Sequence, residues 1–164
     1  MTCSDAEKRA LILVGYASTM KAVQEFEQQL KSIAIYREEL PDGIEADVAW
    51  RRVEKILRAP LGRLEKAVPV DLREHWEEIK RVRNQLAHET LVLWQFERRL
   101  GLRSDEELVD LLLEYESSFL HWAEALEPVA RQCLLDKGIH PEELEFSRKE
   151  MRRMILDGEQ AATS

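Results

Sequence analysis

The chain contains few residues that interrupt helices or cross-link the backbone. Its 164 residues include 6 glycines, 5 prolines, 2 cysteines and a single asparagine. Cys3 and Cys133 lie far apart and form no C-x-x-C pair, so we expect free thiols in a reducing compartment. No apolar run approaches the ~18 residues that a membrane span needs. The composition therefore excludes a disulfide scaffold and predicts no membrane contact.

The beginning of the chain does not resemble a secretion signal. Its apolar stretch ALILVGYA is short and follows the acidic residues Asp5 and Glu7, whereas a signal peptide begins with basic residues. We therefore expect a cytoplasmic protein. The length suits one domain with a single core, which we place at residues 1–156, followed by a flexible tail at 157–164.

Charge is distributed unevenly along the chain. The net charge of −8 argues against a general nucleic-acid binder. Residues 51–103 nevertheless carry 13 basic against 8 acidic side chains, whereas residues 104–147 carry 2 against 12. This asymmetry fits a local anion site or a polar association between copies, and it equally fits solvated helix faces.

Helix boundaries are well marked in the sequence. In a capping box, an N-cap oxygen and a glutamate three residues later satisfy free backbone amides. The pattern occurs at residues 4–7, 42–45, 71–74 and 104–107, and a proline at position 141 marks a fifth start. Breaks are expected at residues 41–43, 60–69, 101 and 137–138, and no alternating strand pattern is present.

The spacing of apolar residues also predicts helices. A stripe runs from Tyr16 to Ala34, and another runs from Leu108 to Cys133. A leucine or isoleucine recurs every seven residues between Leu72 and Leu100, which predicts one long helix there. Together these patterns predict an all-α, up-and-down helical bundle of about five helices. The four tryptophans are interpreted as packing anchors.

The single asparagine lies in the stretch RVRNQLAHE, between an arginine and a histidine. Arg83 is permanently charged and presents a planar fork of donors that suits phosphate oxygens. Histidine is the side chain whose unperturbed pKa lies nearest to neutral pH, so His88 is a candidate to take or give a proton. Asn84 is able to hydrogen-bond the imidazole or a phosphate. Cleavage of RNA through its own 2′-hydroxyl needs only these kinds of groups.

The angular positions on this helix suggest a second buried face. With Leu86 facing the core, Asn84 and His88 lie on the opposite side at about 100° per residue. The same outer face carries Leu91, Val92 and Gln95. Taken as a whole, this face is too apolar to be left in water. We therefore expect a homodimer whose interface includes these three residues and brings two motifs together.

Arg83, Asn84 and His88 resemble the R-φ-x3-H signature of the HEPN domain superfamily, in which φ is often Asn, Asp or His. The resemblance implies a metal-independent endoribonuclease of a toxin–antitoxin or phage-defence system, without cofactors, in which two motifs of a dimer line one cleft. It implies that Arg83 contacts the scissile phosphate, that His88 acts in acid/base chemistry or charge stabilisation, and that Asn84 is the polar φ residue. One toxin branch has a modified tyrosine two residues after the histidine, where this chain has Thr90.

Basic residues near the motif are candidates for guiding RNA by charge. They are Lys80, Arg81, Arg51, Arg52 and Lys55. No metal site is expected, since no other histidine has a second His or Cys at ligand spacing.

A non-catalytic alternative fits the same residues. In it, Arg83 belongs to a surface salt-bridge network with glutamates, and His88 is an ordinary partly buried imidazole. The protein would then be a HEPN-like helical regulator or interaction module, with an antitoxin or another protein as partner.

Overall fold

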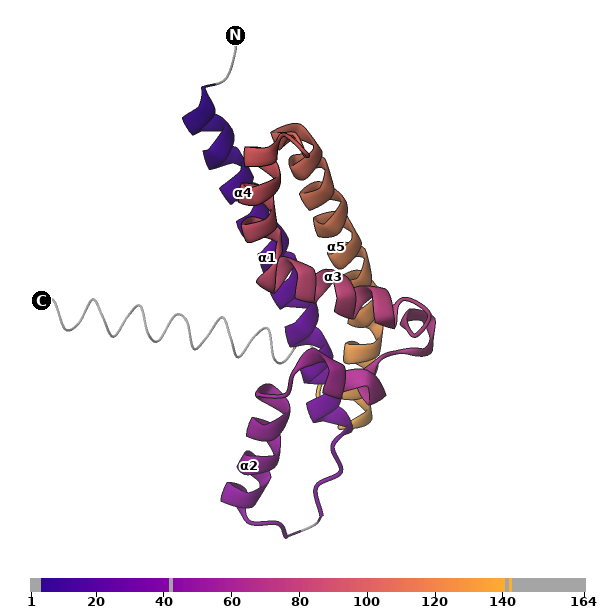
Figure 1. The fold of residues 1–164 in the computed structure, drawn as a ribbon. Helices are drawn as coiled ribbons and strands as arrows, with labels where there is room; N and C mark the ends of the chain where they lie inside the picture. The colour runs from indigo at the N-terminus through magenta and orange to yellow at the C-terminus, as the bar shows by residue number, and fades with distance from the viewer. Residues whose placement is uncertain (1–3, 42, 141, 143–164) are drawn as a thin grey trace, which may run out of the picture.

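A computed structural model describes residues 4–41, 43–140 and 142 of the chain. Every regular element among these residues is a helix, which confirms the predicted all-α bundle (Figure 1). The predicted domain end at residue 156, the tail at 157–164 and the fifth helix from Pro141 lie outside the described residues. The α-helices are α1 (Asp5–Arg37), α2 (Ala46–Leu57), α3 (Trp76–His88), α4 (Thr90–Leu100) and α5 (Asp105–Asp136), and the short 3-10 helices are η1 (Leu61–Ala67) and η2 (Val70–Leu72).

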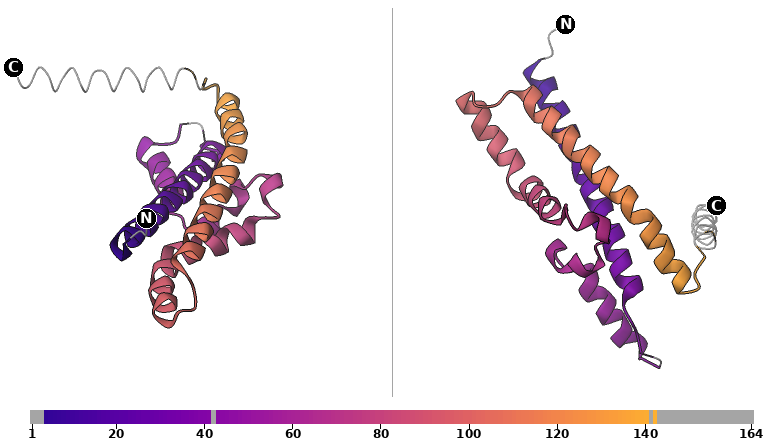
Figure 2. Two further views of the ribbon diagram at one scale, coloured as in Figure 1. Left: turned by 90° about the horizontal axis from the view of Figure 1, so that it is seen from above. Right: turned by 90° about the vertical axis from the view of Figure 1, so that its right-hand side faces the viewer.

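The two long helices, α1 and α5, lie side by side and run in the same direction (Figures 1 and 2). Lys8 pairs with Glu106, and the Ser18 hydroxyl donates to Glu116, so both pairs are 98 residues apart. A constant offset between partners requires parallel helices. The intervening chain must therefore return from the end of α1 to the beginning of α5, and α2, α3 and α4 form along this return path.

Aromatic side chains occupy the centre of the core between α1 and α5. Phe26 and Phe119 are fully buried, and their rings meet edge to face with centroids 5.7 Å apart. Trp122 packs edge to face against Phe119 at 5.1 Å. A buried hydroxyl also joins the helices, because Thr19 Oγ1 lies 3.1 Å from the carbonyl oxygen of Leu112. Most of the predicted apolar stripes of both helices are buried here.

The capping boxes predicted for the two long helices are present. The Ser4 and Ser104 hydroxyls accept from the amides of Glu7 and Glu107, and both glutamates accept from the serine amides in return. The backbone N–H of Ser104 lowers the pKa of the Glu107 carboxyl, because it stabilises the charged form. Local sequence therefore determines where α1 and α5 begin.

The other two capping signals do not start a helix. Residue 42 lies outside the described residues, and α2 begins at Ala46 after Glu45, without a side-chain cap. Asp71 lies within η2, a turn follows, and α3 begins only at Trp76. Prolines precede both signals, at positions 41 and 69, and restrict the local backbone.

The predicted single helix from Leu72 to Leu100 is wrong, because the chain breaks between α3 and α4. Glu89 leaves helical geometry with φ −120° and ψ −38°. The Gln85 carbonyl oxygen accepts from the Glu89 amide at 2.9 Å and also from the Thr90 hydroxyl at 3.0 Å. The break reorients α4, so Leu86 is 1 % exposed whereas Leu100 is 59 % exposed.

Three tryptophans anchor the core as predicted, and the fourth does not. Trp76, Trp94 and Trp122 are buried, but Trp50 is 60 % exposed. The interpretation of Trp50 as a packing anchor is therefore wrong. Trp50 lies on α2, which buries none of its residues in this chain.

Replacing Phe119 by alanine should destabilise the fold strongly. The substitution leaves a cavity beside two aromatic rings, and such changes cost about 3–5 kcal/mol of unfolding free energy. Urea unfolding followed by circular dichroism measures this cost. Leu113, which is 55 % exposed on α5, provides the control, because Leu113→Ala should change stability by less than about 0.5 kcal/mol. Equal effects of the two substitutions would contradict the described core.

Candidate functional site

The motif residues occupy the last turns of α3, on the sides of the helix that its geometry predicts. Asn84 and His88 are exposed, and Arg83 is half-buried at the flank. Leu86, which lies between Asn84 and His88 in the sequence, points into the core. The predicted place in the middle of a long helix is wrong, since His88 is the final residue of α3.

Both long helices hold the backbone and side chains at this end of α3. The Tyr16 hydroxyl of α1 donates to the Leu86 carbonyl oxygen at 2.8 Å. From α5, the Tyr115 hydroxyl donates to Gln85 Oε1 at 3.4 Å. These bonds satisfy polar groups near the helix terminus and fix its position relative to the core. The end of α3 that carries the motif is therefore bonded to both long helices.

Arg83 is held by a carboxylate from another helix. Its Nε donates to Glu27 Oε1 of α1 at 2.6 Å, and the two side chains are 27 % and 16 % exposed. Its Nη1 donates to Asn84 Oδ1 at 3.3 Å. The contacts with Glu27 and Asn84 orient the Arg83 guanidinium. The remaining guanidinium N–H donors and the Asn84 side-chain NH₂ group are left for a ligand.

His88 differs from Arg83 in having an open environment. Within residues 4–41, 43–140 and 142, its imidazole makes no hydrogen bond and no ion pair. Five residues along a helix correspond to a separation of about 140° between Arg83 and His88. One chain therefore presents the cation and the imidazole on different sides of α3.

The other basic residues predicted for RNA form two separate groups. On α3, Lys80 Nζ lies 2.6 Å from Glu77 and Arg81 Nη1 lies 3.4 Å from Gln85 Oε1. Three more lie on α2. There Arg51 pairs with Asp47 at 3.5 Å and Arg52 with Glu38 at 3.6 Å, while Lys55 lines a pocket with Arg52. That pocket contains none of the three motif residues.

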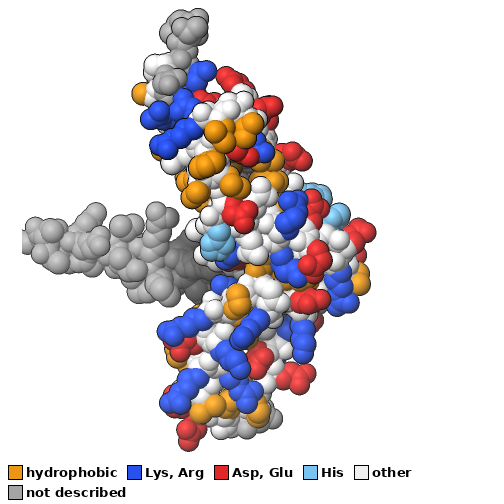
Figure 3. Space-filling model, viewed as in Figure 1, with side chains coloured by type: hydrophobic (Ala, Val, Ile, Leu, Met, Phe, Trp, Pro, Cys, Tyr) orange, Lys and Arg blue, Asp and Glu red, His pale blue; other side chains and the backbone are white. Residues whose placement is uncertain are grey.

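The outer face of α4 is apolar and exposed. Val92 is 69 % exposed and Phe96 is 66 % exposed, and Gln95 is also exposed. Figure 3 shows hydrophobic side chains gathered over this part of the molecule. Leu91 requires a correction, because it is half-buried and packs against the core of its own chain. Its predicted place at an interface depended on a helix that continues past Glu89.

Sequence reasoning did not identify Glu27, Tyr16 and Tyr115 as neighbours of the motif. The partners in the Glu27–Arg83 pair are 56 residues apart, and those in the Tyr16–Leu86 bond are 70 apart. Tyr16 gave a partial signal through its place on the apolar stripe of α1, where a tyrosine hydroxyl needs a partner. No local pattern distinguishes Glu27 from the other acidic residues of α1.

No protein-family model, curated protein or solved structure matches this chain. The resemblance to the HEPN superfamily therefore rests on residues 83–88. Within the described part of the chain, no three or more His, Cys, Asp or Glu side chains are grouped to hold a metal ion. None of the described helices combines the length and apolar character needed to cross a bilayer.

A double-mutant cycle should show that Glu27 and Arg83 are coupled. The pair is largely shielded from water, so we expect a coupling of about 1 kcal/mol between Glu27→Ala and Arg83→Ala. Urea unfolding of the two single variants and the double variant gives this value. Glu25 provides the control, because it pairs with Lys21 instead, and Glu25→Ala should combine additively with Arg83→Ala. Additive effects in the Glu27 cycle would mean that this ion pair contributes nothing measurable.

Proposed function

We propose that the protein is a metal-independent endoribonuclease of the HEPN type. The observation that supports this function is the arrangement of the motif. An arginine oriented by Glu27 lies beside the exposed amide of Asn84, and the open imidazole of His88 follows on the same helix. Preorganised charge close to an imidazole, a side chain that can accept or donate a proton, suits phosphoryl chemistry.

The proposed reaction breaks the RNA backbone without an added nucleophile. The 2′-hydroxyl loses its proton and attacks the adjacent phosphorus, and the 5′-oxygen of the next nucleotide leaves with a proton. The products are a 2′,3′-cyclic phosphate and a 5′-hydroxyl. Arg83 stabilises charge on the phosphorus centre, and His88 transfers a proton or stabilises charge.

The geometry of α3 favours a site built from two chains. Arg83 and His88 point about 140° apart, so one copy does not readily place both on one phosphate. The exposed apolar face of α4 begins four residues after His88, at Val92. A twofold contact through this face buries it and brings two motifs near one cleft. We therefore propose a homodimer as the active form.

The Arg83–Glu27 pair also favours a second candidate, a non-catalytic helical regulator or interaction module. A guanidinium whose Nε is committed to a carboxylate at 2.6 Å is already stabilised without a ligand. In this alternative, Arg83 joins α3 to α1, and the acidic α5 and apolar α4 bind a protein partner. This alternative would be favoured if neither the wild-type protein nor its variants cleaved RNA and the double-mutant cycle gave a strong Arg83–Glu27 coupling.

Purified protein should cleave single-stranded RNA in the presence of EDTA, and His88→Ala should slow the reaction by about 10²–10⁴-fold. Arg83→Ala should also abolish most of the activity, because it removes the stabilising charge. Gel analysis of labelled RNA, with identification of the 2′,3′-cyclic phosphate end, measures both effects.

The control for this experiment is His121→Ala, since His121 is an exposed histidine on α5 outside the motif. It should cleave at the wild-type rate. If wild type and His88→Ala cleave RNA equally, or if neither does, the ribonuclease proposal fails. Growth arrest on expression that disappears with Arg83→Ala would support a toxin-like activity.

Phe96→Glu should convert the proposed dimer into a folded monomer. Phe96 is 66 % exposed, so the substitution costs little within one chain but places like charges at a twofold contact. Analytical ultracentrifugation gives the oligomeric state, and ribonuclease activity should fall with dissociation. Leu91 is unsuitable for this test, because a glutamate there would disrupt the core of a single chain.

Leu113→Glu provides the matched control, since Leu113 is an exposed leucine on α5. It should leave the dimer intact. A wild-type protein that sediments as a monomer at tens of micromolar, a range in which weak specific dimers form, argues against the homodimer.

A further inference from the structure

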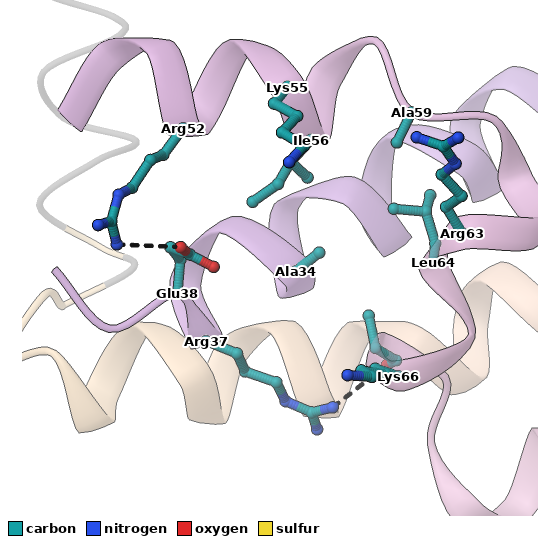
Figure 4. A pocket seen from close by; sticks show the side chains of 11 residues that line it. Ala34, Arg37, Glu38, Arg52, Lys55, Ile56, Ala59, Arg63, Leu64 and Lys66 are labelled. Carbon is teal, nitrogen blue, oxygen red and sulfur yellow. Dashed lines mark hydrogen bonds and ion pairs between the residues drawn. The ribbon is translucent and has the colours of Figure 1, made fainter. Parts of the chain in front are cut away.

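A pocket lies at the C-terminal end of α1, away from the motif on α3. The last turn of α1, one face of α2 and the 3-10 helix η1 line this open pocket of about 710 Å³. Figure 4 shows side chains from all three segments directed toward this space. The volume falls in the range of about 300–1,000 Å³ that is typical of small-molecule sites.

The rim of the pocket is strongly basic, although the whole chain has a net charge of −8. Glu38 is the one carboxylate among the residues that line it. The basic residues that line it are Arg37, Arg52, Lys55, Arg63 and Lys66. Five cations therefore surround one acidic group.

Most of this positive charge is not neutralised within the described residues. Arg52 lies 3.6 Å from Glu38, and Arg37 Nη1 donates to the Ala67 carbonyl oxygen at 3.3 Å. Lys55, Arg63 and Lys66 make no ion pair with any described residue. Like charges around one concave space repel one another, and a bound anion relieves that repulsion.

The floor of the pocket has a different character from its rim. It is formed by small or branched apolar side chains: Ala34, Ile56, Ala59, Leu64 and Ala67. The alanines leave space rather than filling it. A ligand that fits both parts carries its charge at one end and a compact apolar group at the other.

We propose that this pocket binds a small organic ligand that carries two closely spaced phosphate groups and a compact apolar part. Arginine forks and lysine ammonium groups on opposite walls match the oxygens of a diphosphate. The apolar floor matches an uncharged group attached to it. This inference is independent of the proposed ribonuclease function, because no residue of the Arg83 motif lines the pocket.

Isothermal titration calorimetry with inorganic pyrophosphate and with isopentenyl diphosphate, a five-carbon alkyl diphosphate, tests the proposal. The titrations contain EDTA and salt at about 0.15 M, which screens exposed charges that are far apart. Both probes should bind wild-type protein at one site, the alkyl diphosphate more tightly, and inorganic sulfate should bind far more weakly. His88→Ala should bind both probes as the wild type does.

The double variant Lys55→Gln/Arg63→Gln should weaken binding of both probes by at least about tenfold, which corresponds to 1.4 kcal/mol. The matched control is Lys21→Gln/Arg73→Gln, which also removes one lysine and one arginine, both exposed and outside the pocket. It should bind as the wild type does. Equal weakening in the two double variants would show attraction by net charge alone and would overturn the site.

A third variant separates shape from charge. Ala34→Leu partly fills the apolar floor and keeps all five cations, so it should weaken the alkyl diphosphate much more than pyrophosphate. A thermal melt checks that Ala34→Leu folds. If it does not fold, the double variant Lys55→Gln/Arg63→Gln still tests the proposal. Absence of binding of both probes to wild-type protein overturns the proposal. The proposal is also overturned if neither diphosphate binds but a short single-stranded RNA does, and if the variant Lys55→Gln/Arg63→Gln loses that RNA binding.

Discussion

Phe26 and Phe119 meet at the centre of the contact between α1 and α5, and the positions of the other helices depend on that contact. Tyr16 reaches α3 from one long helix, and Tyr115 reaches it from the other. The end of α3 is therefore placed correctly only when α1 and α5 are already in register. A change in the packing of the two phenylalanines would alter the candidate site, although neither ring touches it.

The sequence predicted those parts of the fold that depend on local signals. The serine capping boxes located the beginnings of α1 and α5, and the apolar stripes identified most of their buried residues. The end of α3 was missed because neither glycine nor proline marks it. The break lies at Glu89, where the Thr90 hydroxyl bonds to the Gln85 carbonyl oxygen, and a threonine in an apolar stretch gives no clear signal of such a break.

The candidate site was predictable to a similar extent. Helical geometry alone placed Asn84 and His88 on the side of the helix opposite Leu86 and Arg83 at its flank, and the structure agrees with these directions. The Glu27 partner and the basic pocket were not predictable, because each joins segments that are distant in the sequence. From the sequence, two of the pocket's cations, Arg52 and Lys55, are expected to guide RNA, and only the fold reveals that they line a pocket.

The parallel arrangement of α1 and α5 has a consequence for how the chain folds. Partners along this contact, such as Lys8 and Glu106, are 98 residues apart, so the closing loop is long. Contacts of high sequence separation slow folding relative to bundles whose neighbouring helices follow one another. During synthesis, α1 emerges well before α5 and exposes its apolar stripe until the partner is complete. For that interval, the stripe is exposed apolar surface of the kind that makes incompletely folded chains prone to aggregate.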